Sequence, residues 1–189
     1  MKFILVLFFT ILITVFAGTV IKELPHQDHL GLVSPVAFST VGSPGDYPDW
    51  QVFTNDYFHY QISYPSDISL NNGLTGDVSL LKNKVLDITI TQGNLAEKDT
   101  VNTVVEKAIN TKKSLAKTNF SLLKSISPIA LGSVTALTYT SLENGQQIVS
   151  YYVPQTQNKY LLITNTSPDT NNDDFYTSEK IIYSLELLP

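Results

Sequence analysis

The sequence predicts an α+β sandwich over residues 50–189, an antiparallel β-sheet flanked by helices and preceded by an N-terminal hydrophobic helix. Two observations predict this fold class. Short segments rich in β-branched and aromatic residues alternate with turn residues along most of the chain, which is typical of antiparallel strands. A middle segment and a late segment change to the helical period of about 3.6 residues. Strands interrupted by one helix and followed by another indicate an α+β domain.

The composition fits one domain of ordinary size with an additional N-terminal segment. Of the 189 residues, 43% are hydrophobic and 11% are aromatic, which suffices for a packed core. The chain has no cysteine, so disulfides, thiolate metal sites and a cysteine nucleophile are excluded. All 12 basic residues are lysines and the net charge is −5, so the chain lacks the basic character that nucleic-acid binding requires.

Residues 1–21 are predicted to be a signal peptide or an N-terminal membrane anchor. Lys2 precedes an uncharged run over residues 3–21, whose length as a helix, roughly 28 Å, is close to the thickness of the hydrocarbon core of a bilayer. If the segment is a signal peptide, cleavage is expected near Ala17; if it is an anchor, residues 3–21 hold the chain in the membrane. Both interpretations place the remainder outside the cytoplasm.

Residues 22–49 are predicted to form a flexible linker, because they contain four prolines and three glycines without a clear period. His26 and His29 in this segment have a spacing that presents two imidazoles to one metal on a helix. Pro25 and Gly31 flank the pair, so solvated linker histidines are the favoured interpretation.

The domain is predicted to begin with strands at residues 51–55 and 58–65, followed by strands at 78–82 and 84–92. Residues 70–77 have the composition of a turn-rich connection. One side of the second strand carries the residues predicted for the core: Phe58, Tyr60, Ile62 and Tyr64. That strand ends in a proline, which cannot donate a sheet hydrogen bond and therefore suits a strand end.

Residues 99–119 are predicted to form an amphipathic helix. Its apolar stripe consists of Val101, Val104, Val105, Ala108 and Leu115. Asp99 or Thr100 is suited to cap the helix start. The lysines near its end match the negative end of the helix dipole, which favours a solvated face over a binding patch.

The remaining chain predicts a long strand at 120–131, two hairpins and a second helix. Asn144–Gly145 between two β-rich segments indicates a tight hairpin, and residues 154–158 indicate a looser one. Residues 171–188 are predicted to be helical, with an extended end as the alternative. One side of this helix carries Phe175, Ser178, Ile182 and Leu185.

The two ends of the domain resemble the PsbP family, the extrinsic proteins of the photosynthetic oxygen-evolving complex and their bacterial relatives. The family pattern begins with an asparagine, an aromatic strand and a Tyr-Pro-x-Asp turn, and the corresponding residues here are Asn55, Phe58, Tyr60, Ile62, Tyr64, Pro65, Ser66 and Asp67. The pattern ends with an isoleucine, a serine and a large apolar residue, which are similar to Ile181, Ser184 and Leu185.

The resemblance covers about residues 50–188, with three departures. The family usually has glycine at the position of His59, tryptophan at Ile68 and phenylalanine at Leu185. The resemblance implies an αβα sandwich of the PsbP/Mog type and a noncatalytic docking module at a membrane surface.

No catalytic or cofactor-binding residue is predicted, and the chain is predicted not to be an enzyme. Nucleophilic catalysis by serine needs a base, and residues 50–189 contain a single histidine, His59, and no G-x-S-x-G motif. Glycine-rich phosphate-binding motifs are also absent from the sequence.

A weak Ca²⁺ site is the one metal interpretation that the domain's sequence offers. When residues 169–174 are aligned with an EF-hand loop, Asp174 stands where glycine is required and Lys180 stands where the bidentate glutamate belongs. A capped helix start explains the segment better. Weak binding through Asp169, Asp173 and Asp174 is the alternative, and some PsbP proteins are associated with divalent ions.

These observations together predict an exported, membrane-anchored binding or assembly module whose partner is an envelope or membrane protein. The alternatives are an exported hydrolase with an unrecognised site and a divalent-ion-binding accessory protein. A pocket that pairs His59 with a serine and a carboxylate would favour the hydrolase, whereas a solvent-facing His59 without such partners would favour the binding module.

Overall fold

The structure is a computed structural model that describes residues 49–73, 75–82, 86–116, 119–166 and 173–189. Its strands are β1 (Trp50–Asn55), β2 (Tyr60–Pro65), β3 (Ser69–Asn72), β4 (Val78–Lys82), β5 (Leu86–Asn94), β6 (Phe120–Leu131), β7 (Val134–Glu143), β8 (Gln146–Pro154), β9 (Lys159–Asn165) and β10 (Glu186–Leu187). Its helices are α2 (Val101–Ala116) and α3 (Asp173–Tyr183).

The predicted signal peptide or anchor at residues 1–21 and the linker at 22–49, apart from Asp49, lie outside the described residues. Within the described ranges, no helix is long and apolar enough to cross a membrane.

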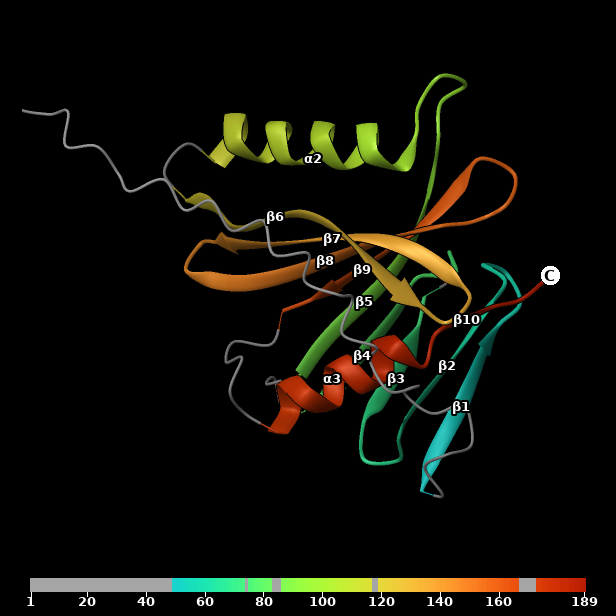
Figure 1. Cartoon of the computed structure of the whole chain (residues 1–189). Coiled ribbons are helices and arrows are strands. Elements are labelled where there is room, and N and C mark those ends of the chain that lie inside the picture. The colour runs from blue at the N-terminus through green and yellow to red at the C-terminus, as the bar shows by residue number, and fades with distance from the viewer. Residues whose placement is uncertain (1–48, 74, 83–85, 117–118, 167–172) are drawn as a thin grey trace, which may run out of the picture. The chain divides into compact units, whose positions relative to one another are not determined.

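The strands form two antiparallel sheets, where the sequence predicted one. Seven strands follow the order β3-β4-β5-β9-β8-β7-β6, and three follow the order β1-β2-β10 (Figure 1). Pro65 ends β2, and a turn closed by the Ile68 N–H donating to the Pro65 carbonyl at 3.1 Å leads the chain into the larger sheet. The segment that was predicted as a plain connection contains β3, which pairs with β4.

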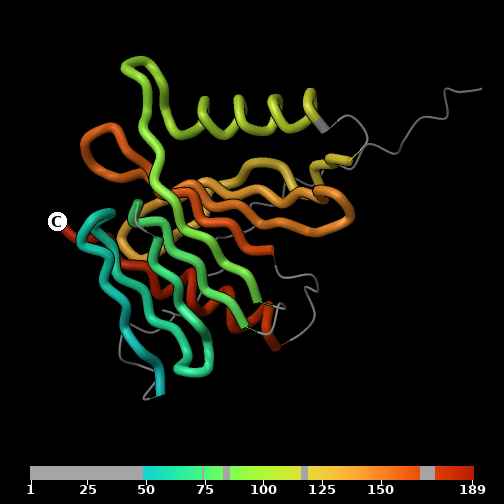
Figure 2. Tube along the Cα trace, turned by 180° about the vertical axis from the view of Figure 1, so that it is seen from behind, coloured from blue at the N-terminus to red at the C-terminus, as the bar shows by residue number. Residues whose placement is uncertain are grey.

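The two helices cover opposite faces of the seven-stranded sheet, as the cartoon and the Cα tube show from opposite sides (Figures 1 and 2). Neighbouring residues of a strand point to opposite faces. On β8, Tyr151 belongs to the core cluster beside α3, whereas Tyr152 belongs to the cluster beneath α2. The α+β class with helices on both sides of an antiparallel sheet is therefore confirmed for the described part of the chain.

The larger core cluster joins β2, β4, β5, β8, β9 and α3. Its members include Tyr60, Ile62, Leu80, Ile88, Ile90, Leu161, Ile163, Ile181 and Ile182. Burying each such side chain stabilises the fold by roughly 1.5–3 kcal/mol. The predicted core side of β2 is confirmed for Tyr60 and Ile62, while Tyr64 is half-buried and donates its hydroxyl to Gln51 at 3.2 Å.

The smaller core cluster lies beneath α2 and contains Val105, Ile109, Phe120, Tyr139 and Tyr152. Three tyrosine rings stack across neighbouring strands in this layer. The Tyr139 and Tyr152 centroids are 6.2 Å apart and those of Tyr152 and Tyr160 are 5.6 Å apart, with interplanar angles of 29° and 27°. The Tyr160 ring lies against the backbone of Gly93, its cross-strand partner, where a Cβ atom would collide with the ring.

The predicted apolar stripe of α2 is correct at its start and wrong at its end. Leu115 is 77% exposed, whereas Ile109 is buried. Strand β7 ends at Glu143, whose carboxylate binds the Lys112 ammonium at 2.7 Å, and Leu115 lies beyond this contact on the last turn of the helix. At the helix start, the Thr103 N–H donates to the Thr100 hydroxyl at 3.3 Å, which confirms one of the two expected caps.

The C-terminal segment is helical up to Tyr183 and then extended, so the helix predicted to continue to residue 188 is wrong at its end and the extended alternative is confirmed. α3 buries Ser178 and Ile182 as predicted and ends at Tyr183. Leu185 is buried beyond the helix end, just before β10 joins β2. The Ser184 hydroxyl accepts a hydrogen bond from the Ser63 N–H at 2.8 Å, which ties this segment to β2.

Asn55 organises the turn between β1 and β2. Its side-chain oxygen accepts hydrogen bonds from the Phe58 and Tyr57 N–H groups at 2.9 and 3.1 Å. Its side-chain nitrogen donates to the Gly76 carbonyl at 2.8 Å. Because of this turn, β2 begins at Tyr60, two residues later than predicted. His59 has a φ of 53°, in the left-handed region that favours glycine.

His59→Gly is therefore expected to raise the free energy of unfolding by up to about 1 kcal/mol, because glycine reaches a positive φ without steric strain. His59→Val should lower it by about 1–2 kcal/mol, since a β-branched residue is least tolerated there. Urea unfolding followed by circular dichroism measures both. Equal stability of the two variants would show that the turn does not hold this residue in the left-handed region.

Candidate functional site

A small pocket lies where three distant segments of the chain meet. It has a volume of about 160 Å³ and is lined by His59, Gln92, Gln155, Thr156, Gln157, Lys159, Leu187, Leu188 and Pro189. His59 comes from the turn before β2, the glutamines and Lys159 from β5 and the β8–β9 hairpin, and the leucines from the C-terminal end. Drug-sized ligands occupy pockets of roughly 300–1,000 Å³, so this one suits a group of a few heavy atoms.

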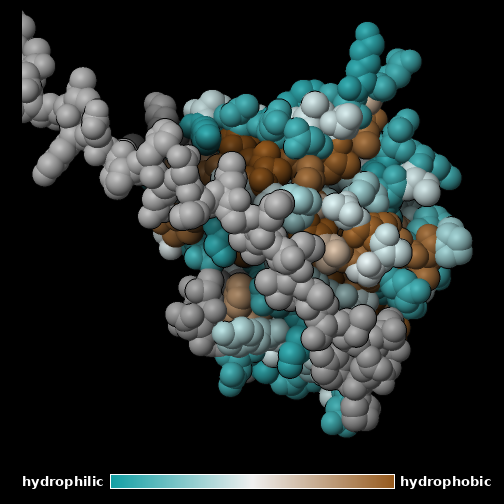
Figure 3. Space-filling view, viewed as in Figure 1, coloured by the Kyte–Doolittle hydropathy of each residue, from teal (hydrophilic) through white to brown (hydrophobic). Residues whose placement is uncertain are grey.

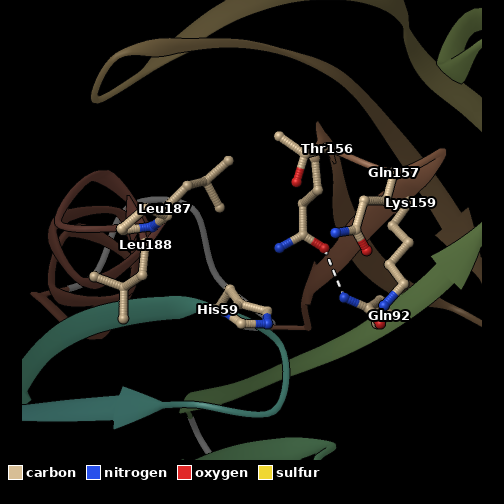
Figure 4. Close-up of a pocket in the computed structure, with 9 residues that line it drawn as sticks. His59, Gln92, Thr156, Gln157, Lys159, Leu187 and Leu188 are labelled. Atoms are coloured by element: carbon tan, nitrogen blue, oxygen red, sulfur yellow. Dashed lines mark hydrogen bonds between the residues drawn. The ribbon is translucent and has the colours of Figure 1, made fainter.

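Gln155 connects the turn before β2 to β5 and the β8–β9 hairpin. Its side-chain nitrogen donates to the Phe58 carbonyl at 2.7 Å, next to His59. Its side-chain oxygen accepts from the Gln92 side-chain nitrogen at 2.8 Å, as the dashed line in Figure 4 marks. The C-terminal wall is held by the Leu188 N–H, which donates to the His59 carbonyl at 2.9 Å. These bonds connect β5, the hairpin, the turn and the chain end.

Left-handed backbone conformations shape two sides of the pocket. His59 has a φ of 53°, and Gln157 and Asn158 in the hairpin have φ values of 59° and 58°. Non-glycine residues adopt such values rarely, and they concentrate where the surrounding structure holds them in place. Here the Gln155 side chain donates to the Phe58 carbonyl and the Leu188 N–H donates to the His59 carbonyl, so the peptide groups on both sides of the His59 Cα atom are held.

The pocket has a polar side and an apolar side. Figure 4 shows Leu187 and Leu188 on one side, Gln92, Gln157 and Lys159 on the other, and His59 between them. Within the described part of the chain, the side chains of His59, Thr156, Gln157 and Lys159 make no hydrogen bond or ion pair. Their donors are therefore available to a ligand.

The pocket does not combine the residues of a serine hydrolase. His59 is exposed, and none of the residues that line the pocket is a serine, an aspartate or a glutamate. The sequence singled out His59 alone and missed Gln92, Gln155 and Lys159. The glutamine-rich hairpin at 154–158 contains Gln155, but it predicted a turn and not a site, and no sequence signal pointed to Gln92 on β5 or to Lys159 at the start of β9.

The three candidate metal ligands are only partly described. Asp169 lies outside the described residues, and Asp173 and Asp174 begin α3. The Lys82 ammonium lies 3.5 Å from Asp174 and 3.1 Å from Asp67. The hydrogen bond to Asp67, together with the charges of both aspartates, outweighs desolvation and raises the pKa of Lys82. Among the described residues no three acidic, histidine or cysteine side chains form a metal-binding group, and the Ca²⁺ interpretation stays a prediction.

A second hollow lies between α2 and the edge strand β6. Its lining combines Ile109, Leu122 and Ile126 with polar residues of α2. Figure 3 shows apolar side chains gathered at the surface beneath this helix. The side chains between α2 and the sheet are thus less completely buried than those on the α3 side of the sheet. On the α3 side, the core residues of β5 and β9 are buried.

Comparison with known proteins identifies the fold. A scan against protein-family models finds no match, and a search of curated proteins finds no relative. Among solved structures, the chain is similar to cyanobacterial PsbP (CyanoP) from Synechocystis sp. PCC 6803, with a TM-score of 0.54 and 12% identity over 79% of this chain and 99% of that chain. LpqN, involved in cell envelope biogenesis of Mycobacterium tuberculosis, matches with a TM-score of 0.47 and 16% identity over 74% and 92% of the two chains.

The fold of this chain is therefore PsbP-like, which confirms the fold that the resemblance of its two ends implied. The match to CyanoP extends over nearly all of that protein, so the whole domain and not one motif carries the similarity.

Proposed function

We propose that this chain is an extracytoplasmic binding or assembly module without catalytic activity. Residues 3–21 hold it at the membrane or direct its export, and the linker 22–49 presents the domain to an envelope or membrane protein. The PsbP-like fold supports this role because the resemblance to that family implies docking at a membrane surface.

The observation that carries the proposal is the composition of the pocket around His59. The pocket offers an imidazole, an ammonium, a hydroxyl and amides, all hydrogen-bonding groups, next to an aliphatic wall. Ligand sites commonly combine an apolar surface with a few placed polar groups. Catalysis by the alternative hydrolase would need a nucleophile and an orienting carboxylate beside His59, and the lining residues provide neither a serine nor an acidic side chain.

The proposal is tested by affinity purification of the tagged full-length chain from membranes of the source organism, followed by mass spectrometry of bait and prey. We expect one envelope protein to be recovered in stoichiometric amount, and a bait that begins near Met1 if residues 3–21 act as an anchor. A bait that begins near Gly18 together with no stable partner would contradict the anchored assembly role.

A pair of variants connects the partner to the pocket. The double variant His59→Gly/Lys159→Gln removes the imidazole and the ammonium of the pocket, and the first change is compatible with the left-handed turn. Lys113→Gln on α2 changes one exposed lysine far from it in the sequence and serves as the control. Loss of the partner from the double variant alone would place the interface at the pocket.

A further inference from the structure

We infer that β1 is a strand-addition site, at which a second copy of this chain pairs its own β1 antiparallel about a two-fold axis. The three-stranded sheets of the two copies then join into one sheet of order β10-β2-β1-β1-β2-β10. The inference goes beyond the proposed function, because the partner is a second copy and not another envelope protein.

The other sheet edges of the described chain carry features that discourage pairing. The seven-stranded sheet ends in β3, which has four residues, and in β6, which contains Lys124 and Pro128 and shifts its register with β7 twice. The edge strand β10 has two residues. Short length, bulges, lysine and proline are the features that protect exposed edges from association.

β1 has none of these features. It has six residues, of which none is charged and none is proline, and it keeps a single register with β2 along its whole length. Figures 1 and 2 show it at the outer side of the three-stranded sheet. A regular, uncharged edge of this kind is a template for a further strand.

The hydrogen bonds of β2 show which backbone groups of β1 point outward. The Ser63 N–H donates to the Ser184 hydroxyl at 2.8 Å, and Ser184 leads into β10, on the side of β2 away from β1. Backbone groups of neighbouring residues in a strand point to opposite sides. Those of Ile62 therefore face β1, where its cross-strand partner is Phe53, and Phe53 is bonded to β2.

Val52 and Thr54 flank Phe53, so their N–H and C=O groups point away from β2, toward the outer edge of the sheet. Within the described part of the chain, no strand pairs with this edge and no backbone group binds these two residues there. The Val52 side chain is 51% exposed. The edge thus offers two N–H donors and two carbonyl acceptors to an added strand.

The strand is complementary to itself. When the two-fold axis passes through Phe53, Val52 stands opposite Thr54 of the second copy, the two residues exchange two hydrogen bonds, and the axis repeats this pair. Because β1 is uncharged, an identical strand places no like charges opposite each other. Asp49 and Asp56, which flank the strand, do not face each other in this register. The pairing is closed, since the joined sheet ends in β10 on both sides.

The contact is small, because it consists of one short strand from each copy. Stable interfaces commonly bury roughly 1,200–2,000 Å², so we expect a weak dimer that depends on protein concentration. If residues 3–21 anchor the chain as proposed, confinement to one membrane raises the effective concentration of the two copies and favours their pairing.

Cross-linking tests the register, because the chain has no cysteine of its own. In the full-length chain in a mild detergent, Phe53→Cys is expected to give a disulfide-linked dimer on mild oxidation, since the two Cβ atoms lie opposite each other at about 4.5–5.5 Å. Thr54→Cys is the control. This position is more exposed, but its diagonal separation of about 7–8 Å is too long for a disulfide. Equal cross-linking of both variants, or none from Phe53→Cys, would overturn the inference.

A second measurement leaves the core side chains unchanged. Thr54→Pro removes the outward N–H and spares the bonds between β1 and β2, because proline is tolerated on an edge strand where the N–H faces solvent. Sedimentation equilibrium should show the dimer weakened roughly 30-fold, since the two-fold axis makes the loss two hydrogen bonds. Val52→Ala keeps its N–H and should dimerise like the wild type. A wild-type chain that is monomeric throughout, or a Thr54→Pro dimer as tight as the wild type, would contradict the pairing.

The same variants distinguish the second copy from another occupant of the edge. If the chain stayed monomeric while Thr54→Pro lost the envelope protein recovered by affinity purification and Val52→Ala retained it, β1 would be the binding site of that protein. This outcome would overturn the dimer and leave the proposed binding role intact.

Discussion

Asn55→Ala is expected to lower the free energy of unfolding by about 3 kcal/mol, because it leaves three backbone groups without their partner. Asn55 is 4% exposed, and its side chain accepts from two N–H groups of the turn before β2 and donates to the Gly76 carbonyl. The methyl group of alanine replaces none of these bonds. Chemical denaturation with urea gives the change directly.

Tyr60→Phe is the control for this experiment. It removes a hydroxyl that Asn55 contacts at the long distance of 3.4 Å, so it should cost less than about 1 kcal/mol. If Asn55→Ala were as mild as Tyr60→Phe, the side chain of Asn55 would not be what holds the turn. The turn carries His59 into the pocket, so Asn55→Ala should also weaken any ligand bound there.

The folded domain is expected to lose stability steeply above about pH 10, the ordinary pKa of tyrosine. Burial raises the pKa of Tyr60, Tyr151 and Tyr152 far above that value. The folded state thus keeps these protons while the unfolded state releases them, so the stabilisation is complete below pH 10 and decreases as the pH rises further. Each tyrosine contributes about 1.4 kcal/mol per pH unit, and the three together about 4.

Urea unfolding at a series of pH values between neutral and strongly alkaline measures this slope. Tyr151→Phe should make this slope shallower by about 1.4 kcal/mol per pH unit, because one linked proton is removed. Tyr176→Phe changes a ring that is 55% exposed and should leave the slope unchanged. A stability that stays constant above pH 10 would contradict the burial of these phenols.

Local sequence patterns predicted most of the elements because their signals are local. Asn144–Gly145 forms the tight hairpin with φ values of 52° and 80°, and the strand predicted at 120–131 is β6 with the same bounds. The errors arose where contacts between distant segments determine which residues are buried. Leu115 continues the helical period, but it lies beyond the contact of Lys112 with Glu143, the last residue of β7, and it is exposed. The helical period alone does not show where a neighbouring strand stops.

Local sequence patterns also did not predict that the strands divide into two sheets. β3 has four residues and few β-forming ones, and it forms because Val78–Lys82 offers an edge to pair with. The pocket was unpredictable for a related reason. Its residues come from positions as distant as His59, Gln92 and Leu188, and the bonds of Gln155 that join them exist only in the folded chain.

The stacked tyrosines give the domain a second optical reporter. The single tryptophan, Trp50, lies on β1 in the three-stranded sheet and packs against the larger core cluster. The rings of Tyr139, Tyr152 and Tyr160 lie on the seven-stranded sheet beneath α2. Tryptophan fluorescence therefore reports on the larger core cluster, and the part of the near-ultraviolet circular dichroism that comes from the three stacked rings reports on the α2 layer. Whether these two signals change together distinguishes unfolding in one step from separate loss of the α2 layer.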